Sequence, residues 1–311
     1  MADKNGETFF TRAGPTRAAL ALCKSLPPAP AEALIRVITR VLVTVKPDNY
    51  RGASDNLHHM LPDGTSEREH QRTLYRLFYH AAKSYYYLFH NLAYSNDPRT
   101  FRPPVRMTDD VRRFIDQAVK TGRGLFIAGS HTSNFDLAGI AMTQYLPKPV
   151  QVLSIANPTS GFEFMNQMRT NDNGFVTPIT PASLRDAIQR LREGGIVMTG
   201  TDHPVAGGNS PLTFFGHTAY LPTGYMRIPM MTDALVMTLA NTFDGEAYRI
   251  VGNRAIELER TGDRAHDIQT NAQRVLSQLE AFIRRAPDQW MVFDPIFAND
   301  GADHTTQTAE G

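Results

Sequence analysis

Cysteine is almost absent from this sequence, since Cys23 is the only one among 311 residues. A single cysteine excludes a disulfide framework and a Cys-rich zinc or iron–sulfur site. An excess of charge of one sign is also lacking, because 32 Lys and Arg residues stand against 31 Asp and Glu residues. This balance excludes a protein that binds nucleic acid through bulk positive charge, so we expect no nucleic-acid partner.

Long apolar runs and a secretory signal are lacking as well. No stretch reaches the roughly 18 consecutive apolar residues of an unambiguous transmembrane helix. The opening residues, MADKNGETFF, lack a basic region followed by an apolar one. Hydrophobic residues nevertheless make up 41% of the chain, which excludes a wholly disordered protein. We therefore expect a globular protein of the cell interior, either free or bound to a membrane face.

The chain changes character near residue 100. Residues 17–100 carry helical patterns and are predicted to form an N-terminal helical segment that packs on the core and associates with a membrane. Residues 101–297 alternate short apolar runs with amphipathic stretches and are predicted to form the core domain. Residues 1–16 and 298–311 are polar, and we expect loose termini there.

The local patterns predict the elements of both parts. In the N-terminal segment, prolines at 27–30 predict a break, and helical patterns cover 32–46 and 66–94. The predicted core strands cover 124–130, 150–156, 175–179, 195–202, 234–243 and 246–258, with a loop from 203 to 221. Strands that alternate with helices predict an α/β fold with a central, mostly parallel sheet flanked by helices. Ligands bind at the carboxyl ends of strands in such sheets, which directs attention to the residues just after 130 and just after 200.

A histidine follows the first of these strands. His131 stands at the junction to the next helix, and Asp136 follows five residues later. A short loop at this distance can bring the carboxylate back to one ring N–H. That hydrogen bond would fix the tautomer and raise the basicity of the other nitrogen, which makes His131 a candidate general base. The alternative is an ordinary histidine beside ordinary helix-capping residues.

A nucleophile to accompany this histidine is missing. The pattern Gly-x-Ser-x-Gly does not occur in the chain, and Cys23 lies far away in the helical segment. The simpler chemistry is therefore a base that acts on a bound hydroxyl without a covalent enzyme intermediate.

The residues around His131 resemble a known family. The stretch GLFIAGSHTSNFDLAG resembles the His-x-x-x-x-Asp/Glu block of the lysophospholipid acyltransferase superfamily. More narrowly, it is similar to the lipid A late acyltransferase and phosphatidylinositol mannoside acyltransferase group, with Phe135 in place of the usual Trp and Asp136 in agreement. Two further stretches, FFGHTAYLPTGYMRIPMMTDALVMTLA (214–240) and PDQWMVFDPIF (287–297), resemble later blocks of this group. The resemblance covers roughly residues 30–297.

This resemblance implies a fold like that of the glycerolipid acyltransferases and an O-acyl transfer. A fatty acyl group would move from an acyl thioester, carried by coenzyme A or an acyl carrier protein, to a hydroxyl of a membrane lipid or glycolipid. His131 would deprotonate that hydroxyl, and Asp136 would orient the imidazole. The helix that starts after His131 could supply N–H donors to the charge that develops on the carbonyl oxygen. No cofactor besides the thioester co-substrate is implied.

Two charged residues are implied to stabilise charge near this pair. Arg169, on the next helix, matches an Arg of the mannoside acyltransferase branch, and its alternative is a solvated helix residue. Asp202 ends the strand IVMTGTD at the edge where His131 lies, and it could pair with Arg169. Its alternative is a cap of the following loop. His203 follows where the family often has Gln, which is a departure.

Further residues are assigned to substrate binding because they belong to the resembling blocks. A Gly-containing turn that enters a helix at Thr223 could expose N–H groups to a phosphate or headgroup oxygen, although a plain Ser/Thr cap would look the same. His217 could line the site. The residues assigned to substrate binding are Ser130, Asn134, Phe215, Gly216, His217, Thr223 and Gly224.

Basic residues outnumber acidic ones around the most apolar helix. Between residues 12 and 51 only Glu32 and Asp48 oppose the basic residues Arg12, Arg17, Lys24, Arg36, Arg40, Lys46 and Arg51. An apolar helix beside Lys and Arg is typical of a segment that lies on anionic lipid, and 32–46 is too short to span a bilayer. We expect a peripheral protein on the cytoplasmic face of the plasma (inner) membrane. The alternative is that this helix only packs on the core.

Two other classes compete with the acyltransferase. One is a metal-dependent ester or phosphate hydrolase in which His131, Asp136, Asp202 and His203 hold the ion. The other is a lipid-binding protein that keeps the fold without catalysis. For the acyltransferase, a lysophospholipid, a lipid A precursor and a mannosylated phosphatidylinositol remain open as acceptors.

Overall fold

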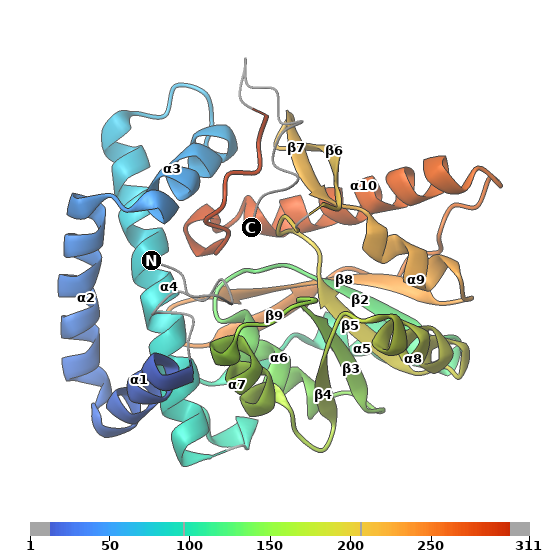
Figure 1. Cartoon of the computed structure of the whole chain (residues 1–311), viewed down its shortest axis with the longest axis horizontal. Coiled ribbons are helices and arrows are strands. Elements are labelled where there is room, and N and C mark those ends of the chain that lie inside the picture. Colours follow the sequence, from blue (N-terminus) through green and yellow to red (C-terminus); the bar gives the residue numbers. More distant parts are fainter. Residues whose placement is uncertain (1–12, 96, 206, 299–311) are drawn as a thin grey trace.

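The computed structural model describes residues 13–95, 97–205 and 207–298, and a seven-stranded sheet forms its centre (Figure 1). The strand order is β1-β9-β8-β2-β5-β3-β4. The strands are β1 (Val105–Met107), β2 (Leu125–Gly129), β3 (Val150–Ser154), β4 (Gly174–Pro178), β5 (Ile196–Gly200), β8 (Leu235–Phe243) and β9 (Tyr248–Gly252). Within the described ranges, β8 and β9 form the one antiparallel pair of this sheet. The predicted α/β class with a mostly parallel sheet is confirmed.

Helices cover both faces of the sheet. They are α5 (Asp109–Lys120), α6 (Phe135–Thr143), α7 (Ser160–Arg169), α8 (Pro181–Arg192), α9 (Arg227–Met230) and α10 (Arg264–Ile283). Successive side chains of β2 point to opposite faces, as the strand period requires. Phe126 packs on the side of α8 and α10, whereas Ile127 packs on the side of α5 and α6. The sheet is therefore buried on both faces, as its continuous apolar runs predict.

Four helices precede the sheet, almost entirely within the predicted helical segment, although the sequence singled out patterns only for 32–46 and 66–94. They are α1 (Ala13–Ser25), α2 (Pro28–Val45), α3 (Asp48–Met60) and α4 (Glu67–Tyr94). The break between α1 and α2 lies at 26–27, whereas Pro28 and Pro30 of the predicted break already belong to α2. Ser66 caps α4 by accepting a hydrogen bond from the Glu69 amide. In Figure 1, α4 lies between α2 and the sheet, and it contacts α1, α2, α3 and α6. In the described residues, no helix is both long and apolar enough to cross a membrane.

The loop predicted from 203 to 221 is wrong for most of its length. Residues 209–222 form an antiparallel hairpin of β6 (Asn209–Phe214) and β7 (His217–Pro222). Its two turn residues, Phe215 and Gly216, both have positive φ angles (53° and 85°), which is typical of a tight hairpin turn. Gly, Pro and Asn before β6 hid the alternation of buried residues, which are Leu212, Phe214, Ala219 and Leu221.

The predicted loose termini fall mostly outside the described residues, at 1–12 and 299–311. The remaining residues are not loose, so the prediction is wrong for them. Residues 13–16 begin α1, which packs on α4 and α7. The Ala298 amide donates a hydrogen bond to the Thr218 carbonyl of β7 (2.9 Å). Tertiary contacts of this kind leave no trace in local composition.

Candidate active site

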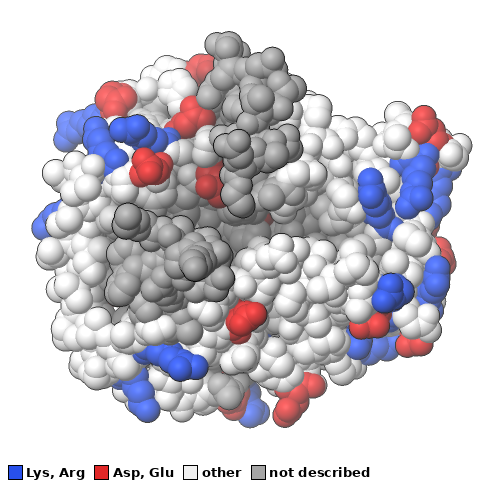
Figure 2. Space-filling view, in the orientation of Figure 1, with Lys and Arg blue, Asp and Glu red and all other residues white. Residues whose placement is uncertain are grey.

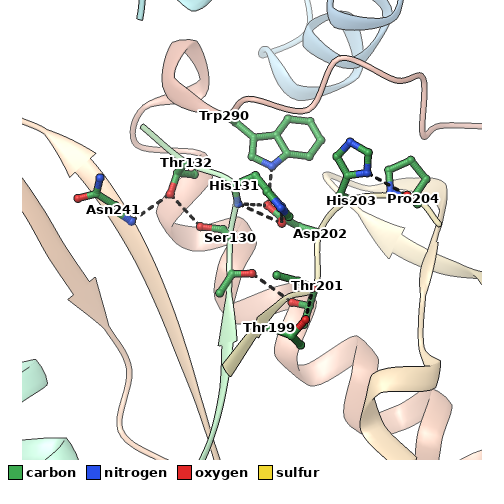
Figure 3. A network of polar contacts seen from close by, with 12 residues as sticks. Ser130, His131, Thr132, Thr199, Thr201, Asp202, His203, Pro204, Asn241 and Trp290 are labelled. Carbon is green, nitrogen blue, oxygen red and sulfur yellow. Dashed lines mark hydrogen bonds and ion pairs between the residues drawn. The ribbon is translucent and has the colours of Figure 1, made fainter. Parts of the chain in front are cut away.

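The strand register brings a histidine and a carboxylate together. β2 and β5 run parallel, and Gly129 lies opposite Gly200. His131 and Asp202 each follow two residues later, so they leave the sheet side by side (Figure 3). Nδ1 of His131 lies 2.6 Å from Oδ1 of Asp202. The backbone amide of His131 also donates to both carboxylate oxygens, at 3.1 and 2.9 Å.

The Asp202 carboxylate is fully buried and has a further donor. The indole N–H of Trp290 donates to its Oδ2 at 2.7 Å. Burial alone would raise the pKa of Asp202, but the charge of His131 and the hydrogen bonds from His131 and Trp290 outweigh it and lower the pKa. Asp202 is therefore held as an ionised acceptor that faces the imidazole.

The imidazole of His131 lies against β5 at Gly200. A Cβ atom added at Gly200 would lie 2.4 Å from Cε1 of His131, so a larger residue there would displace the ring. The ring of Phe135 approaches it edge-on at 4.8 Å, and that of His203 lies at 5.5 Å. About a quarter of the His131 side chain remains accessible (24%). The ring is thus fixed on several sides and still open to a reactant.

The electrostatics suit a base. Burial lowers the pKa of His131, but the charge of Asp202, the hydrogen bond to Asp202 and the charge of Asp136 outweigh burial and raise the pKa above its ordinary value. Because Asp202 accepts from Nδ1–H, the neutral ring carries its lone pair on Nε2. A proton taken at Nε2 would produce an imidazolium that the buried carboxylate stabilises.

The predicted hydrogen bond from His131 to Asp136 is wrong, because Asp202 takes that place. Asp136 lies in the first turn of α6, which carries its carboxylate toward α7. There it accepts from Nη2 of Arg169 at 2.9 Å. The proposed pair of Arg169 with Asp202 is also wrong, because Arg169 pairs with Asp136 instead. Nη1 of Arg169 donates to Asn166 (3.1 Å), and its side chain is only 16% exposed, so it is not a solvated helix residue.

Ser130 and Asn134, both assigned to substrate binding, hold the loop between β2 and α6. The Asn134 side chain accepts from the Leu137 amide, which caps α6, and donates to the Ser84 carbonyl of α4. Ser130 shares a hydrogen bond with the hydroxyl of Thr132 (2.8 Å). These contacts show what the two side chains do in the fold, and their contact with a substrate stays a prediction.

The residues assigned from the second resembling block lie on and after the hairpin. The Phe215 amide donates to Glu280 of α10, and the exposed Gly216 completes the turn. The His217 ring lies 4.9 Å from that of His59 on α3. These contacts join the hairpin to α10 and α3 rather than to His131, and substrate contacts of this turn stay a prediction.

Thr223 and Gly224 follow the hairpin. A 3₁₀ turn (Gly224–Met226) and the four-residue α9 begin here, and the Thr223 side chain makes no capping hydrogen bond. Its hydroxyl instead shares a hydrogen bond with Ser210 of β6 (3.2 Å). So short a helix supplies little of the dipole that the predicted anion site relies on.

Two residues that the sequence did not single out shape the site. Trp290 holds the Asp202 carboxylate, and Gly200 makes room for the imidazole. Trp290 is the one tryptophan of the chain and lies in a resembling block, which was a usable signal. Gly200 gave no signal, because its role depends on which strand lies next to β2.

The proposed metal ligands do not form a coordinating set. Asp202 accepts hydrogen bonds from His131 and Trp290, and Asp136 is paired with Arg169. His203 turns its Nδ1 toward the Pro204 carbonyl. Across the described ranges, no group of three His, Cys, Asp or Glu side chains is arranged to hold a metal ion. The hydrolase hypothesis therefore has no ligand set to support it.

The fold and the site define an α/β protein with a His–Asp dyad at the carboxyl edge of its sheet, in which the carboxylate is buried and the imidazole partly accessible. An imidazole with a basic nitrogen and a buried carboxylate partner is a geometry that suits proton removal from a hydroxyl. Residues 16–298 match the model of the bacterial lipid A biosynthesis acyltransferase family, and the chain belongs to this acyltransferase family. The predicted family is confirmed.

A more specific similarity is to the phosphatidylinositol mannoside acyltransferase of Mycolicibacterium smegmatis (strain ATCC 700084 / mc(2)155). The two chains are 22% identical over 190 residues. The match spans 60% of this chain and 60% of the mycobacterial protein.

Proposed function

We propose that this protein is an O-acyltransferase that moves a fatty acyl group from an acyl thioester to a hydroxyl of a membrane lipid or glycolipid. Family membership supports the reaction class, and the relative's name supports a glycolipid acceptor. The observation that carries the proposal is the His131–Asp202 hydrogen bond of 2.6 Å, which leaves Nε2 as the basic nitrogen.

The reaction needs one base and no covalent enzyme intermediate. Nε2 of His131 takes the proton of the acceptor hydroxyl while its oxygen attacks the thioester carbonyl carbon. The carbon–sulfur bond then breaks, and the leaving thiolate takes the proton back from Nε2. Asp202 stabilises the imidazolium between these two proton transfers. The proposal leaves two carriers of the thioester open, coenzyme A and an acyl carrier protein.

Arg169, positioned by Asp136, would stabilise the negative charge that develops during this reaction. Their ion pair is largely buried, with side chains 16% and 11% exposed. Nε of Arg169 is buried and has no hydrogen-bond partner among the described residues. A cation so placed would offset the negative charge that develops on the carbonyl oxygen, and Asp136 would hold it in position.

Helix α2 supports attachment to a membrane surface. Its inner face, which includes Ile35, packs on α4, and Glu32 turns inward to Lys83 (3.2 Å). Its outer face exposes Leu34, Val37, Ile38, Val41 and Val45, all more than 40% exposed. The exposed Arg36 and Arg40 lie on the same helix. We infer that this face lies on anionic lipid of the cytoplasmic leaflet. Arg12, also counted in the basic excess, lies outside the described residues.

The surface charges agree with a local attachment site. Figure 2 shows Lys and Arg, with Asp and Glu among them, along the margins of one face of the molecule, including the margin over the N-terminal helices. The protein as a whole is close to neutral, at +1. Attraction to anionic lipid would therefore act through particular faces and weaken with salt.

Lipid mass spectrometry tests the proposed reaction. Membrane lipids of cells with and without this protein should differ in one class, which lacks one acyl chain when the protein is removed. The purified protein should then acylate that class with acyl-coenzyme A or an acyl carrier protein as the donor. Unchanged lipids and no transfer from either donor would contradict the proposal.

A further inference from the structure

A C-terminal segment is bound along the loop that carries His131. Residues 287–291 begin with a 3₁₀ turn (Pro287–Gln289). The Ser133 amide donates to the Gln289 carbonyl (2.6 Å), and the Met291 amide donates to the His131 carbonyl (2.7 Å). We call residues 287–291 the strap. Through these two hydrogen bonds, the strap fixes the backbone of the loop that carries His131.

The strap is anchored to the sheet and to the N-terminal helices. The Gln289 side chain accepts from the Phe243 amide (2.7 Å) and donates to the Phe243 carbonyl (3.0 Å), at the end of β8. Asp288 lies 2.9 Å from Nε of Arg76 on α4. The strap is therefore held from two directions, and its side chains have defined positions.

The Trp290 side chain reaches from the strap to Asp202. It is 2% exposed, and the ring of Phe214 packs against it at 5.6 Å. Its indole N–H donates to Oδ2 of Asp202, whereas Nδ1–H of His131 donates to Oδ1. Each oxygen of the carboxylate thus has a separate side-chain donor, and rotation of the carboxylate would break both hydrogen bonds.

We propose that Trp290 is a positioning residue, which acts on the reaction by holding the Asp202 carboxylate in the orientation that keeps Nε2 of His131 basic. This inference rests on the proposed function. The indole N–H fixes Oδ2, so that Oδ1 stays at Nδ1, and the buried ring keeps water away from the carboxylate. Water at that carboxylate would compete for its lone pairs and weaken the hold on the imidazole.

The first test replaces the indole by a ring without the donor. Trp290→Phe should lower kcat by about tenfold with a nearly unchanged KM, because the substrate does not touch Trp290. Without the indole donor the carboxylate can rotate and water can reach it, so its hold on the imidazolium proton weakens. The acid limb of the kcat/KM profile should therefore move to lower pH by about half a pH unit.

The matched control is Phe214→Leu, which disturbs the packing around the indole and keeps the N–H donor. It should lower the melting temperature and leave the acid limb in place. Other charged or titratable groups near the dyad stay unchanged in both variants: Tyr85, Asp136, Arg169, His203 and Tyr225. A folded Trp290→Phe protein with a wild-type acid limb, or with one at higher pH, would overturn the inference.

A second test needs no substitution at Trp290 and no activity. Because the chain has one tryptophan, its indole N–H gives a single resonance in a ¹⁵N–¹H spectrum. That resonance should titrate with the pKa of His131 and should lose this titration in His131→Ala. An indole resonance that ignores pH in the wild type would overturn the inference even if Trp290→Phe failed to fold. A titrating resonance in a protein without acyl transfer would instead contradict the proposed function alone.

Discussion

Oδ1 of Asp202 lies 2.6 Å from Nδ1 of His131, although 71 positions separate the two residues in the chain. The parallel pairing of β2 with β5 creates this contact, because each residue lies two positions beyond glycines that face each other in the sheet. The dyad is therefore a product of strand register. Its carboxylate is fully buried, and its imidazole keeps an accessible edge.

Substitutions of the two aspartates should separate their roles. In the wild type, kcat/KM should rise with pH through a midpoint above the ordinary histidine value of about 6.5, because the base must be neutral and the pKa of His131 is raised. Asp202→Asn removes the main cause of that rise. The midpoint should move to lower pH, and kcat should fall by at least about tenfold.

Asp136→Asn provides the comparison, because its charge raises the pKa of His131 less than that of Asp202. It should move the midpoint in the same direction and by less. The pH dependence of kcat/KM measures both variants. A larger displacement for Asp136→Asn than for Asp202→Asn would mean that Asp136 is the residue that controls the imidazole.

A methyl group at Gly200 should displace the catalytic ring. The added Cβ would lie 2.4 Å from Cε1 of His131, so the imidazole must move. Gly200→Ala should reduce kcat/KM by about a hundredfold, since misplacement by about 1 Å is enough for such a loss. The control is Gly129→Ala on the facing strand, where the nearest atom lies at 3.6 Å. Equal rates for the two folded variants, by initial-rate assay, would contradict this account of the ring position.

The outer face of α2 should determine vesicle binding. Val37 and Val41 are 54% and 55% exposed on that face. The double substitution Val37→Glu and Val41→Glu adds negative charge there and should weaken binding to phosphatidylglycerol vesicles by at least about tenfold. Met231→Glu, at an exposed position on another part of the molecule, should bind as the wild type does. Sedimentation with vesicles measures all three, and undiminished binding of the double variant would place the lipid contact elsewhere.

Removal of divalent cations should leave acyl transfer intact. The carboxylates of Asp136 and Asp202 accept hydrogen bonds from Arg169, His131 and Trp290, so neither is free to bind an ion in this arrangement. Transfer rates in excess chelator should match those without it. A loss of rate that added Zn²⁺ or Mg²⁺ restores would contradict this account and support a metal-dependent reaction.

The sequence predicts the core of the fold well, because buried strands such as β2 and β5 are continuous apolar runs between turn residues. It also predicts that His131 lies at a strand end. The hairpin 209–222 was missed, because its alternation is short and follows Gly, Pro and Asn. The partner of His131 was missed for a different reason. Spacing along the chain favours Asp136 as the partner. The strand order of the sheet instead places Asp202 beside His131, and no local sequence pattern contains that order.

The most direct test of the account is the rate of acyl transfer by His131→Ala with the lipid that the mass spectrometry identifies. The matched control is His266→Ala, at an exposed histidine of α10. Loss of a general base predicts a rate about a hundredfold or more below the wild type for His131→Ala, and an unchanged rate for the control. A folded His131→Ala protein that transfers the acyl group at the wild-type rate would contradict the assignment of His131 as the base.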